Sequence, residues 1–471
     1  MSTALPRFGT LMVLTAVLGC AADAPSPPTA SLAPIGPQTQ PPAAPPAETV
    51  PSALAPAPDL PEAPRVTDYL AVAARNSPAL MAAFNAWRAA LERAPQVRAL
   101  PDPQVTYAHY IQEVETRVGP QRNRVQIAQT FPWPAKLQLR EDAAMQAARA
   151  ARLRCDAAKL RLFHQVKAAY SEYYFCGRAL AVTEENLRLL QHLESVVRTR
   201  YRGDDAGRKD LLRLQVELGK IEDRLRGLQD LRAPLNQRLW AALGTPATRT
   251  LPFPDRLEPA DTACDDANLL AWAAEANPEL KALDADAGEQ KRKVELAEKQ
   301  ALPDLTVGVT WIDTGHARGA VQPPDSGRDP LVASVSVSVP LWWERIHAGV
   351  REARFRHVAA LKQRADKAND LAAQVKRAAY LYRDAQRRID LYDRVLVPRA
   401  TESLKVTERA FVAGKADFGD LVDAQRVLLE LQLTRERALA DRAIRLATLE
   451  RMVARPLPKT GAPSPTSRPA D

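Results

Sequence analysis

One cysteine stands in a sequence context that predicts covalent chemistry. Arg7 precedes a short apolar run, residues 8–18, and Gly19 then comes directly before Cys20. The run is too short to span a bilayer as a helix, which is typical of the apolar region of a signal peptide. Gly-Cys at its end resembles a bacterial lipobox, in which the cysteine thiol is acylated. We predict a signal peptide over 1–19 and lipidation of Cys20; the alternative is an ordinary signal peptide cleaved nearby.

The other residues capable of chemistry form no recognisable catalytic or metal site. The sequence lacks HExxH, GxSxG, P-loop, GxGxxG and CxxC motifs. Cys155 and Cys176 lie 21 residues apart in one helical segment, about 30 Å along its axis, so they cannot pair with each other. The histidines have no carboxylate or cysteine at ligand spacing and are scattered: His109, His164, His192, His316, His347 and His357. We predict no enzyme, no metal and no cofactor.

The composition favours long helices with solvated faces. Of 471 residues, 26% are charged and 6% aromatic, and the net charge of +9 is spread along the chain. No basic cluster interleaved with aromatics occurs, so we expect no nucleic-acid partner. The Pro/Ala-rich segment 20–65 is expected to be an extended tether that carries the lipidated cysteine, and the tail 456–471 to be disordered.

The chain between tether and tail is duplicated. Four short patterns recur at offsets that grow slowly from 200 to 210: "NSPAL" (76–80) with "NPEL" (277–280), "ALPD" (99–102 with 301–304), Pro132 with Pro340, and "KDLLRLQ" (209–215) with "GDLVDAQ" (419–425). Slowly growing offsets indicate one ancestral unit with small loop insertions. We place the first repeat at 66–250, a linker at 251–265 and the second repeat at 266–455.

Each repeat is predicted to hold a helix, two strands, a very long helix and a second helix. The expected ranges are 66–98, 104–113, 122–131, 136–200 and 207–243 in the first repeat, and 266–299, 305–313, 331–341, 344–411 and 418–453 in the second. A 65-residue helix extends for about 100 Å, far beyond a compact domain.

The helix at 207–243 carries an apolar seam at coiled-coil spacing. Its members alternate three and four residues apart: Leu211, Leu214, Leu218, Ile221, Leu225 and Leu228. This spacing predicts an antiparallel coiled-coil hairpin with the preceding long helix, and Pro234 is expected to kink its end.

The four predicted strands alternate between apolar and polar residues. Apolar positions that share a face are Val125, Ile127, Val307, Val309, Val335, Val337 and Val339. Alternation of this kind is compatible with a half-buried strand of a soluble core, with an aggregation-prone segment, or with a strand of a membrane barrel. Trp133, Trp342 and Trp343 follow the strands where an interfacial aromatic girdle would lie.

Four strands cannot close a membrane barrel, because the smallest such barrels have about eight. Open strand edges are not tolerated in lipid. If the strands enter a membrane, several chains must therefore share one barrel, which predicts an oligomer.

Together these features resemble the outer-membrane efflux protein family, the TolC-like channels. The resemblance covers 66–455 and depends on the duplication, on "LPDPQ" before the first strand and on "SVPLWWERIHAGVREARFR" entering the long helix. It depends most on "AFVAGKADFGDLVDAQRVLLELQ" at 410–432, which is similar to the helical-tip motif of the family.

The resemblance implies a mainly α fold with a small membrane β-barrel contribution. Duplicated strand hairpins and long coiled-coil helical hairpins would form a homotrimer, with a twelve-stranded barrel continued by a periplasmic α-helical barrel. It also implies an outer-membrane location and contact with outer-membrane lipid. Its protein partners would be a periplasmic adaptor (membrane fusion protein) and an inner-membrane pump of RND type.

The resemblance also assigns roles to the helical tips. Asp420 and Asp423 match acidic residues that ring the periplasmic aperture in the family, and Asp210 takes the equivalent place in the first repeat. An aspartate in the first turn of a helix also complements the helix dipole without any further role. Positions that hold the aperture shut in some relatives carry Phe411 and Ala416 here.

The two tip turns are predicted to dock the adaptor. These are 201–207, with Gly203 and Asp204, and 411–417, with Gly414 and Lys415. Both glycines permit the left-handed backbone of a tight turn, which is the alternative reason for their presence.

The predicted function is a passive exit duct of a tripartite efflux system, with the substrate left open between heavy metals and drugs. One alternative is the outer-membrane component of a type I protein secretion system. Another, from a different class, is a lipidated periplasmic coiled-coil adaptor or scaffold. An adaptor would have one helical hairpin flanked by compact β-domains, whereas this chain has two equivalent hairpins.

Overall fold

The computed structural model describes residues 60–200, 205–257, 262, 265–321 and 323–458, which all belong to one compact unit. The predicted signal peptide 1–19, Cys20, and the tip residues Gly203 and Asp204 lie outside the described residues. So do nearly all of the tether, part of the linker and most of the tail.

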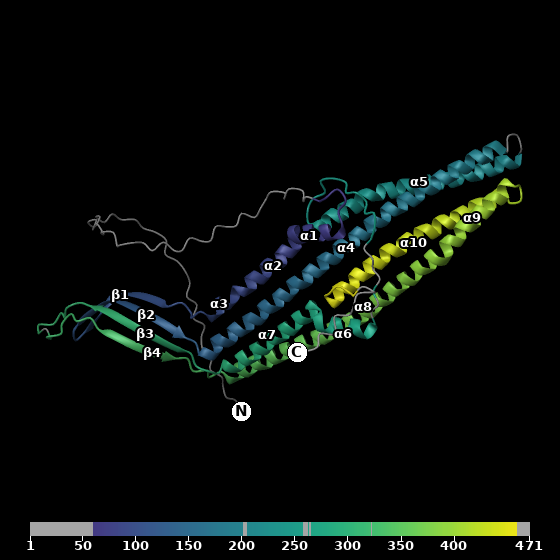
Figure 1. Cartoon of the computed structure of the whole chain (residues 1–471). Helices are drawn as coiled ribbons and strands as arrows, with labels where there is room; N and C mark the ends of the chain where they lie inside the picture. Colours follow the sequence, from purple (N-terminus) through teal and green to yellow (C-terminus); the bar gives the residue numbers. More distant parts are fainter. Residues whose placement is uncertain (1–59, 201–204, 258–261, 263–264, 322, 459–471) are drawn as a thin grey trace, which may run out of the picture. The chain divides into compact units, whose positions relative to one another are not determined.

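The described elements follow the same order in both repeats, as the sequence predicts (Figure 1). The first repeat contains α1 (Val66–Asn76), α2 (Pro78–Leu91), α3 (Arg93–Arg98), β1 (Gln104–Thr116), β2 (Gly119–Phe131), α4 (Pro134–Arg200) and α5 (Asp205–Leu243). The second contains α6 (Asp266–Ala276), α7 (Pro278–Lys299), β3 (Leu305–Thr314), β4 (Leu331–Val337), α8 (Trp343–Leu391), the π-helix η1 (Tyr392–Leu396), α9 (Val397–Val412) and α10 (Phe418–Val453).

The strands form one antiparallel sheet in the order β1-β2-β3-β4, so the two repeats meet between β2 and β3. The register of the two hairpins makes the duplication visible in the backbone. Val105 pairs with Ile127 in the first hairpin, and Val307 pairs with Val335 in the second. The offsets of 202 and 208 read from the sequence convert the first pair into the second.

The first helix of each repeat is broken, where the sequence analysis expected one continuous helix. The break follows from capping: the Ser77 hydroxyl accepts a hydrogen bond from the Leu80 amide at 3.3 Å, and the Asn277 side chain accepts one from the Glu279 amide at 2.9 Å. Proline follows each cap at the first helical position. A capping residue followed by proline starts a new helix, and this signal was present in the repeated "NSP" and "NPE" patterns.

The long helices differ between the repeats. α4 is continuous over 67 residues, about 100 Å at 1.5 Å per residue. Its counterpart is interrupted by the π-helical turn η1 and resumes as α9, whose first turn contains Pro398. Proline has no N–H to donate to the preceding turn, which explains why the interruption lies there. Among the described residues, no helix is long and apolar enough to cross a membrane.

Three apolar clusters hold the helices together. One joins α1 to α4 and to the end of α5, and is centred on the fully buried Tyr69, Tyr173 and Trp240. An equivalent cluster joins α6 and α7 to α8 and α10 in the second repeat. The third lies toward the helical tips and draws on α4, α5, α9 and α10, so the two helical hairpins share one core there.

The predicted coiled-coil seam of α5 is confirmed. Leu214 and Ile221 are buried in the shared core, and Leu218 and Leu228 pack against it. α5 continues through Pro234 to Leu243. Figure 1 shows α9 and α10 meeting at the described tip turn, with the sheet at the other end of α4 and α8.

Candidate functional site

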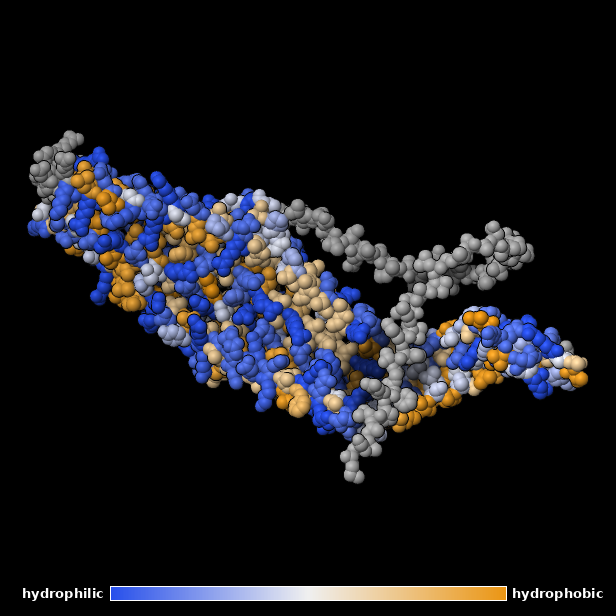
Figure 2. Space-filling view, turned by 180° about the vertical axis from the view of Figure 1, so that it is seen from behind, coloured by the Kyte–Doolittle hydropathy of each residue, from blue (hydrophilic) through white to orange (hydrophobic). Residues whose placement is uncertain are grey.

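The sheet carries its apolar side chains on the outside. Each row of directly paired residues places apolar groups on the same face: Tyr107–Val125–Trp311–Leu331, Val105–Ile127–Val309–Ala333, Gln129–Val307–Val335 and Phe131–Leu305–Val337. Ile127 is 54% exposed, Val309 47% and Val335 68%. Hydrophobic residues gather along this part of the molecule in Figure 2. A soluble sheet would cover such a face, because a contiguous apolar patch of this size is unusual on a soluble monomer.

The opposite face is lined mostly by small and polar side chains. Thr306 bonds Thr130 across the strands at 2.9 Å, and Gly308 and Ser334 are paired neighbours in the next row. The polar Thr310 and the glycine at 308 are both buried. At its centre the sheet is therefore inverted relative to a soluble protein, with Gly308 and Thr310 sheltered and the aliphatic Ile127 and Val309 exposed.

The apolar face ends at a polar row. Beyond Tyr107 and Val125, the next paired residues are His109, Asn123 and Asp313, and the Asn123 side chain donates to Asp313 at 2.6 Å. The apolar rows extend over seven residues of each central strand, from Val125 to Phe131 and from Leu305 to Trp311, about 20 Å. That length is comparable with the apolar band, about 25 Å tall, of outer-membrane barrels.

The prediction for one strand residue, Val339, is wrong. Val339 lies outside β4, which ends at Val337. Ser338 still stands opposite Asp304 in the register of β3 and β4: its amide donates to the Asp304 carbonyl at 3.0 Å, and its hydroxyl accepts from the Asp304 amide at 2.8 Å. Pro340 follows and has no N–H with which to continue a ladder.

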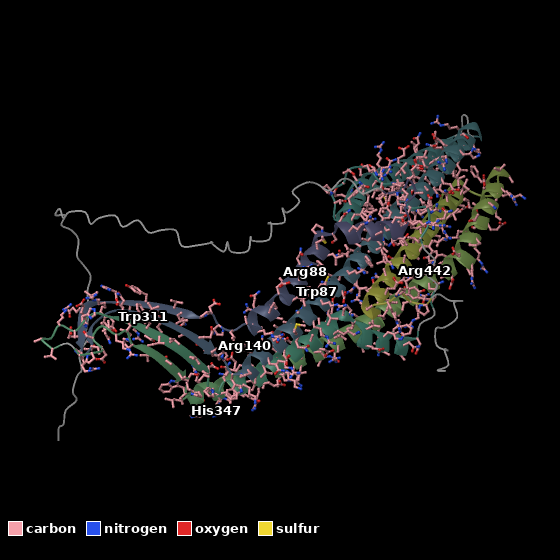
Figure 3. All side chains as sticks on the ribbon, turned by 60° about the vertical axis from the view of Figure 1, so that its left-hand side comes forward. Trp87, Arg88, Arg140, Trp311, His347 and Arg442 are labelled. Carbon is pink, nitrogen blue, oxygen red and sulfur yellow. The ribbon has the colours of Figure 1, made fainter. Side chains whose placement is uncertain are left out.

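The predicted interface tryptophans lie where the strands give way to helices. Trp133 is 45% exposed, Trp342 73% and Trp343 55%. Trp311 lies on the sheet itself, well away from this junction. Figure 3 labels Trp311, and it labels Arg140 and His347 at the junction. Exposed aromatics therefore bracket the apolar rows at both ends, in the arrangement of the two aromatic girdles of a membrane barrel.

A buried ion pair, the Lys136–Asp304 lock, joins the two repeats where the strands meet the long helices. Lys136, at the start of α4, has a side chain only 3% exposed, and its ammonium lies 2.9 Å from the Asp304 carboxylate. It also donates to the Leu302 carbonyl at 2.7 Å, while the Trp133 amide donates to Asp304 at 3.1 Å. In the sequence, the "ALPD" motif is evidence only of the duplication. The structure shows that its aspartate anchors the first repeat to the second.

At the other end of the helices, the described tip turn has the geometry that the glycine predicts. Gly414 has a φ of +73°, and the Lys415 amide closes the turn on the Ala410 carbonyl at 2.8 Å. Phe411 packs against Phe418 with ring centroids 5.8 Å apart and is 1% exposed. Phe411 is thus a core residue of the tip, whereas Lys415 is exposed on the turn.

The three predicted aperture aspartates have different surroundings. Asp420 closes a capping box with Asp417, whose amide donates to the Asp420 carboxylate at 3.3 Å. Asp423 pairs with Arg426 at 3.0 Å, and its side chain is 52% exposed. Asp420 therefore has a capping role in this chain, and an aperture role for either residue stays a prediction.

Asp210 is the partly buried member of the three. Burial and the carboxylate of Asp417 raise the pKa of Asp210 above its ordinary value, although Lys209 and Arg213 oppose the shift. Arg213 extends from α5 over α10: a Cβ atom on Gly419 would lie 2.5 Å from its guanidinium. The structure thus brings Asp210 near Asp417 of the second repeat.

A polar seam between α4 and α10 was not predicted from the sequence. Glu436 is 3% exposed, accepts a hydrogen bond from the Tyr174 hydroxyl at 3.2 Å and lies 2.8 Å from the Arg435 guanidinium. Burial and Glu436 raise the pKa of Tyr174 to about 12. Further along, Arg437 donates to both carboxylate oxygens of Glu172 at 2.8 and 3.0 Å.

This seam links the two repeats along their long helices and would have been difficult to find in the sequence. The consecutive charges of "RER" at 435–437 were the only signal, and a weak one, since three adjacent residues of a helix span about 200° of its circumference and can all face solvent. In the part of the chain that the structure describes, no three His, Cys, Asp or Glu side chains are grouped to hold a metal ion. Cys155 and Cys176 are both free.

The second repeat matches a known family. Residues 269–455 match the family described as outer membrane efflux protein. No curated protein sequence matches the chain. The match agrees, over the second repeat, with the resemblance that the sequence indicated.

Solved structures of outer-membrane channels share the fold. CusC matches with 15% identity and a TM-score of 0.70, over 82% of this chain and 91% of CusC. The outer membrane protein VceC of Vibrio cholerae matches with 18% identity and a TM-score of 0.65, over 82% of this chain and 94% of VceC. The MtrE outer membrane channel of Neisseria gonorrhoeae, in its open state, matches with 16% identity and a TM-score of 0.66, over 84% and 90%. The mainly α fold with a small β contribution is thus confirmed.

Proposed function

We propose that this chain, whose second repeat matches the outer membrane efflux proteins, is a passive exit duct. Its sheet enters the outer membrane together with the sheets of other copies, and its long helices continue the conduit into the periplasm. The observation that carries the proposal is the inverted sheet, with aliphatic side chains exposed on one face and small polar ones sheltered on the other.

The inverted sheet requires partners of its own kind. β1 and β4 are the edges of the four-stranded sheet, and each has only one strand beside it among the described residues. Unpaired backbone groups are not tolerated in lipid, and four strands cannot close a barrel alone. Three copies supply twelve strands, the number that the family resemblance implies, so the working form is a homotrimer.

The helices supply the periplasmic part and the docking surface. α4 alone extends for about 100 Å, and the tip turns at its far end are available to a periplasmic adaptor. Gly203, Asp204, Gly414 and Lys415 form this contact, and an inner-membrane pump of RND type completes the system. Asp210, Asp420 and Asp423 line the periplasmic aperture, where three copies of each focus negative potential.

The remaining parts of the proposal concern anchoring and cargo. Acylation of Cys20 anchors the chain to outer-membrane lipid through the tether 20–65. The exported substrates are small molecules or metal ions, heavy metals or drugs, driven by the pump. A type I secretion role uses the same architecture, and export of a protein in place of small molecules by the cognate pump would distinguish it.

Insertion and conduction test the proposal directly. Full-length protein purified from outer membranes should form discrete ion-conducting channels in a planar bilayer. Val335→Lys places a charge on the apolar face and should abolish insertion, since a lysine near the bilayer midplane costs about 2–4 kcal/mol per chain.

Ser336→Lys is the matched control, because Ser336 is the next residue of β4 and faces the other way. It should insert normally and change only the conductance. A protein that alkaline carbonate releases from membranes and that never conducts would contradict the proposed function.

A further inference from the structure

The two edge strands of the sheet are the counterparts of the two strands that pair between the repeats. β2 belongs to the first hairpin and β3 to the second, and they pair within the chain. By the duplication, β4 corresponds to β2, and β1 corresponds to β3. The β2–β3 seam is therefore a template for a seam between β4 of one copy and β1 of the next.

The correspondence between the repeats is fixed residue by residue. The offset of 202 relates the start of β3 to the start of β1, and the offset of 208 relates the end of β4 to the end of β2. Two pairs observed in the first hairpin, Val105 with Ile127 and Tyr107 with Val125, convert into pairs observed in the second, Val307 with Val335 and Val309 with Ala333. The same offsets therefore apply to the template seam.

We propose that β4 pairs antiparallel with β1 of a second copy in the register that places Val335 opposite Tyr107 and Val337 opposite Val105. The inference deepens the proposed function and rests on it. In the β2–β3 seam, Ile127 pairs with Val309 and Gln129 with Val307. Replacing each β2 residue by its equivalent in β4, and each β3 residue by its equivalent in β1, gives the two proposed pairs.

The side chains support this register. Val335, Val337, Val105 and Tyr107 all lie on the exposed apolar face in their own hairpins. A slip of one residue would place one strand's apolar set on the polar face.

The pairing within the chain also sets a strand tilt for the closed barrel. A row of paired residues that starts at Tyr107 in β1 reaches Trp311 in β3, and the equivalent of Trp311 in β1 is His109. The rows thus advance by the two residues from Tyr107 to His109 for every two strands. An advance of about 6.6 Å over a width of about 9.4 Å corresponds to a strand tilt of about 35°. Membrane barrels have tilts of about 35–45°.

Cysteine pairs test the register in the full-length protein expressed in its membrane. The variant with Val335→Cys and Tyr107→Cys should form covalent oligomers on mild oxidation, about tenfold above either single variant, because Cα atoms directly opposite lie within disulfide distance. Val337→Cys with Val105→Cys is a second pair in the same register, in case one pair disturbs assembly. The single variants retain the native cysteines and control for cross-links through them.

Leu331→Cys with Val105→Cys is the displaced control. Its two positions would lie six residues apart along the seam, about 20 Å, and should not cross-link. Preferential cross-linking of this or another displaced pair in intact oligomers would overturn the register and leave the channel proposal standing. A protein that stays monomeric by light scattering in mild detergent would overturn both.

Discussion

The two repeats share the order of their strands and long helices and the pairing offsets of their hairpins, yet two equivalent positions at the ends of their long helices carry different side chains. Lys136 locks the start of α4 to Asp304 of the other repeat, whereas the offset of 208 places Glu344 at the start of α8. Gly244 ends α5 with a φ of +76°, whereas the offset of 210 places Ala454 after α10 with a φ of +55°. The backbone has been retained where side chains have diverged.

The difference at the first position follows from what each seam joins. The β2–β3 seam lies within one chain, and its lock connects the two repeats permanently. At the proposed seam between copies, Glu344 would lie near Asp102 of the next copy, in the place of a lysine–aspartate pair. Glu344 instead pairs with Arg351 of its own helix at 2.6 Å. The proposed seam between copies thus has no counterpart of the Lys136–Asp304 pair that joins β2 and β3 within the chain.

Breaking the lock within the chain should have the largest effect. Lys136→Glu would put a buried carboxylate beside Asp304 and leave the Leu302 carbonyl without its donor. We expect a loss of about 3–5 kcal/mol per chain, measured as a lower temperature of heat dissociation and of helix unfolding by circular dichroism. Lys136→Met removes the charge with a similar side-chain length and should lose less. Equal stability of Lys136→Glu and the unaltered protein would show that the junction is solvated.

Replacing glycine by alanine at one helix end, and alanine by glycine at the equivalent end, should change the stability in opposite directions. Gly244→Ala introduces a Cβ atom 2.7 Å from the Asn76 carbonyl oxygen at a positive φ, and should destabilise the first repeat by about 2 kcal/mol. Ala454→Gly removes the left-handed penalty of a non-glycine residue and should stabilise the second repeat by about 1 kcal/mol. Thermal unfolding of both variants checks the signs. A stabilising Gly244→Ala would contradict the close approach of the backbone.

Adding a lock between copies should sharpen the comparison. Glu344→Lys would place a lysine where Lys136 lies in the equivalent seam, and should raise the dissociation temperature of the oligomer. We expect about 1 kcal/mol per seam, since the site is more exposed than that of Lys136. Arg351→Ala is the control for loss of the native pair with Glu344 alone. A lower dissociation temperature for Glu344→Lys with an unchanged Arg351→Ala would contradict the proposed seam.

The tip should show a small pH dependence that comes from the first repeat. Because the pKa of Asp210 is raised in the folded tip, the folded state binds more protons than the unfolded state in the window between the ordinary pKa and the raised one. Stability of the tip should therefore fall as the pH rises through that window.

Hydrogen-exchange protection of the tip helices, corrected for intrinsic exchange, measures this. Asp210→Asn should flatten the dependence and raise protection at neutral pH. Asp423→Asn is the matched control, since Asp423 is exposed and pairs within its own helix. An unaltered pH profile in Asp210→Asn would assign the dependence to another group.

The sequence by itself determined the duplication, the long helices, the coiled-coil seam of α5 and the alternating strands. These follow from local patterns, because periodicity and turn residues act over a few neighbouring positions. It also indicated that the strands need other copies, because four strands cannot satisfy their edges in lipid.

Only the tertiary structure decided which distant groups meet. The Lys136–Asp304 lock, the burial of Glu436 between α4 and α10, and the approach of Asp210 to Asp417 each join residues far apart in the chain. Such pairings depend on how two helices or strands are placed against each other, and no local pattern in either partner specifies that placement.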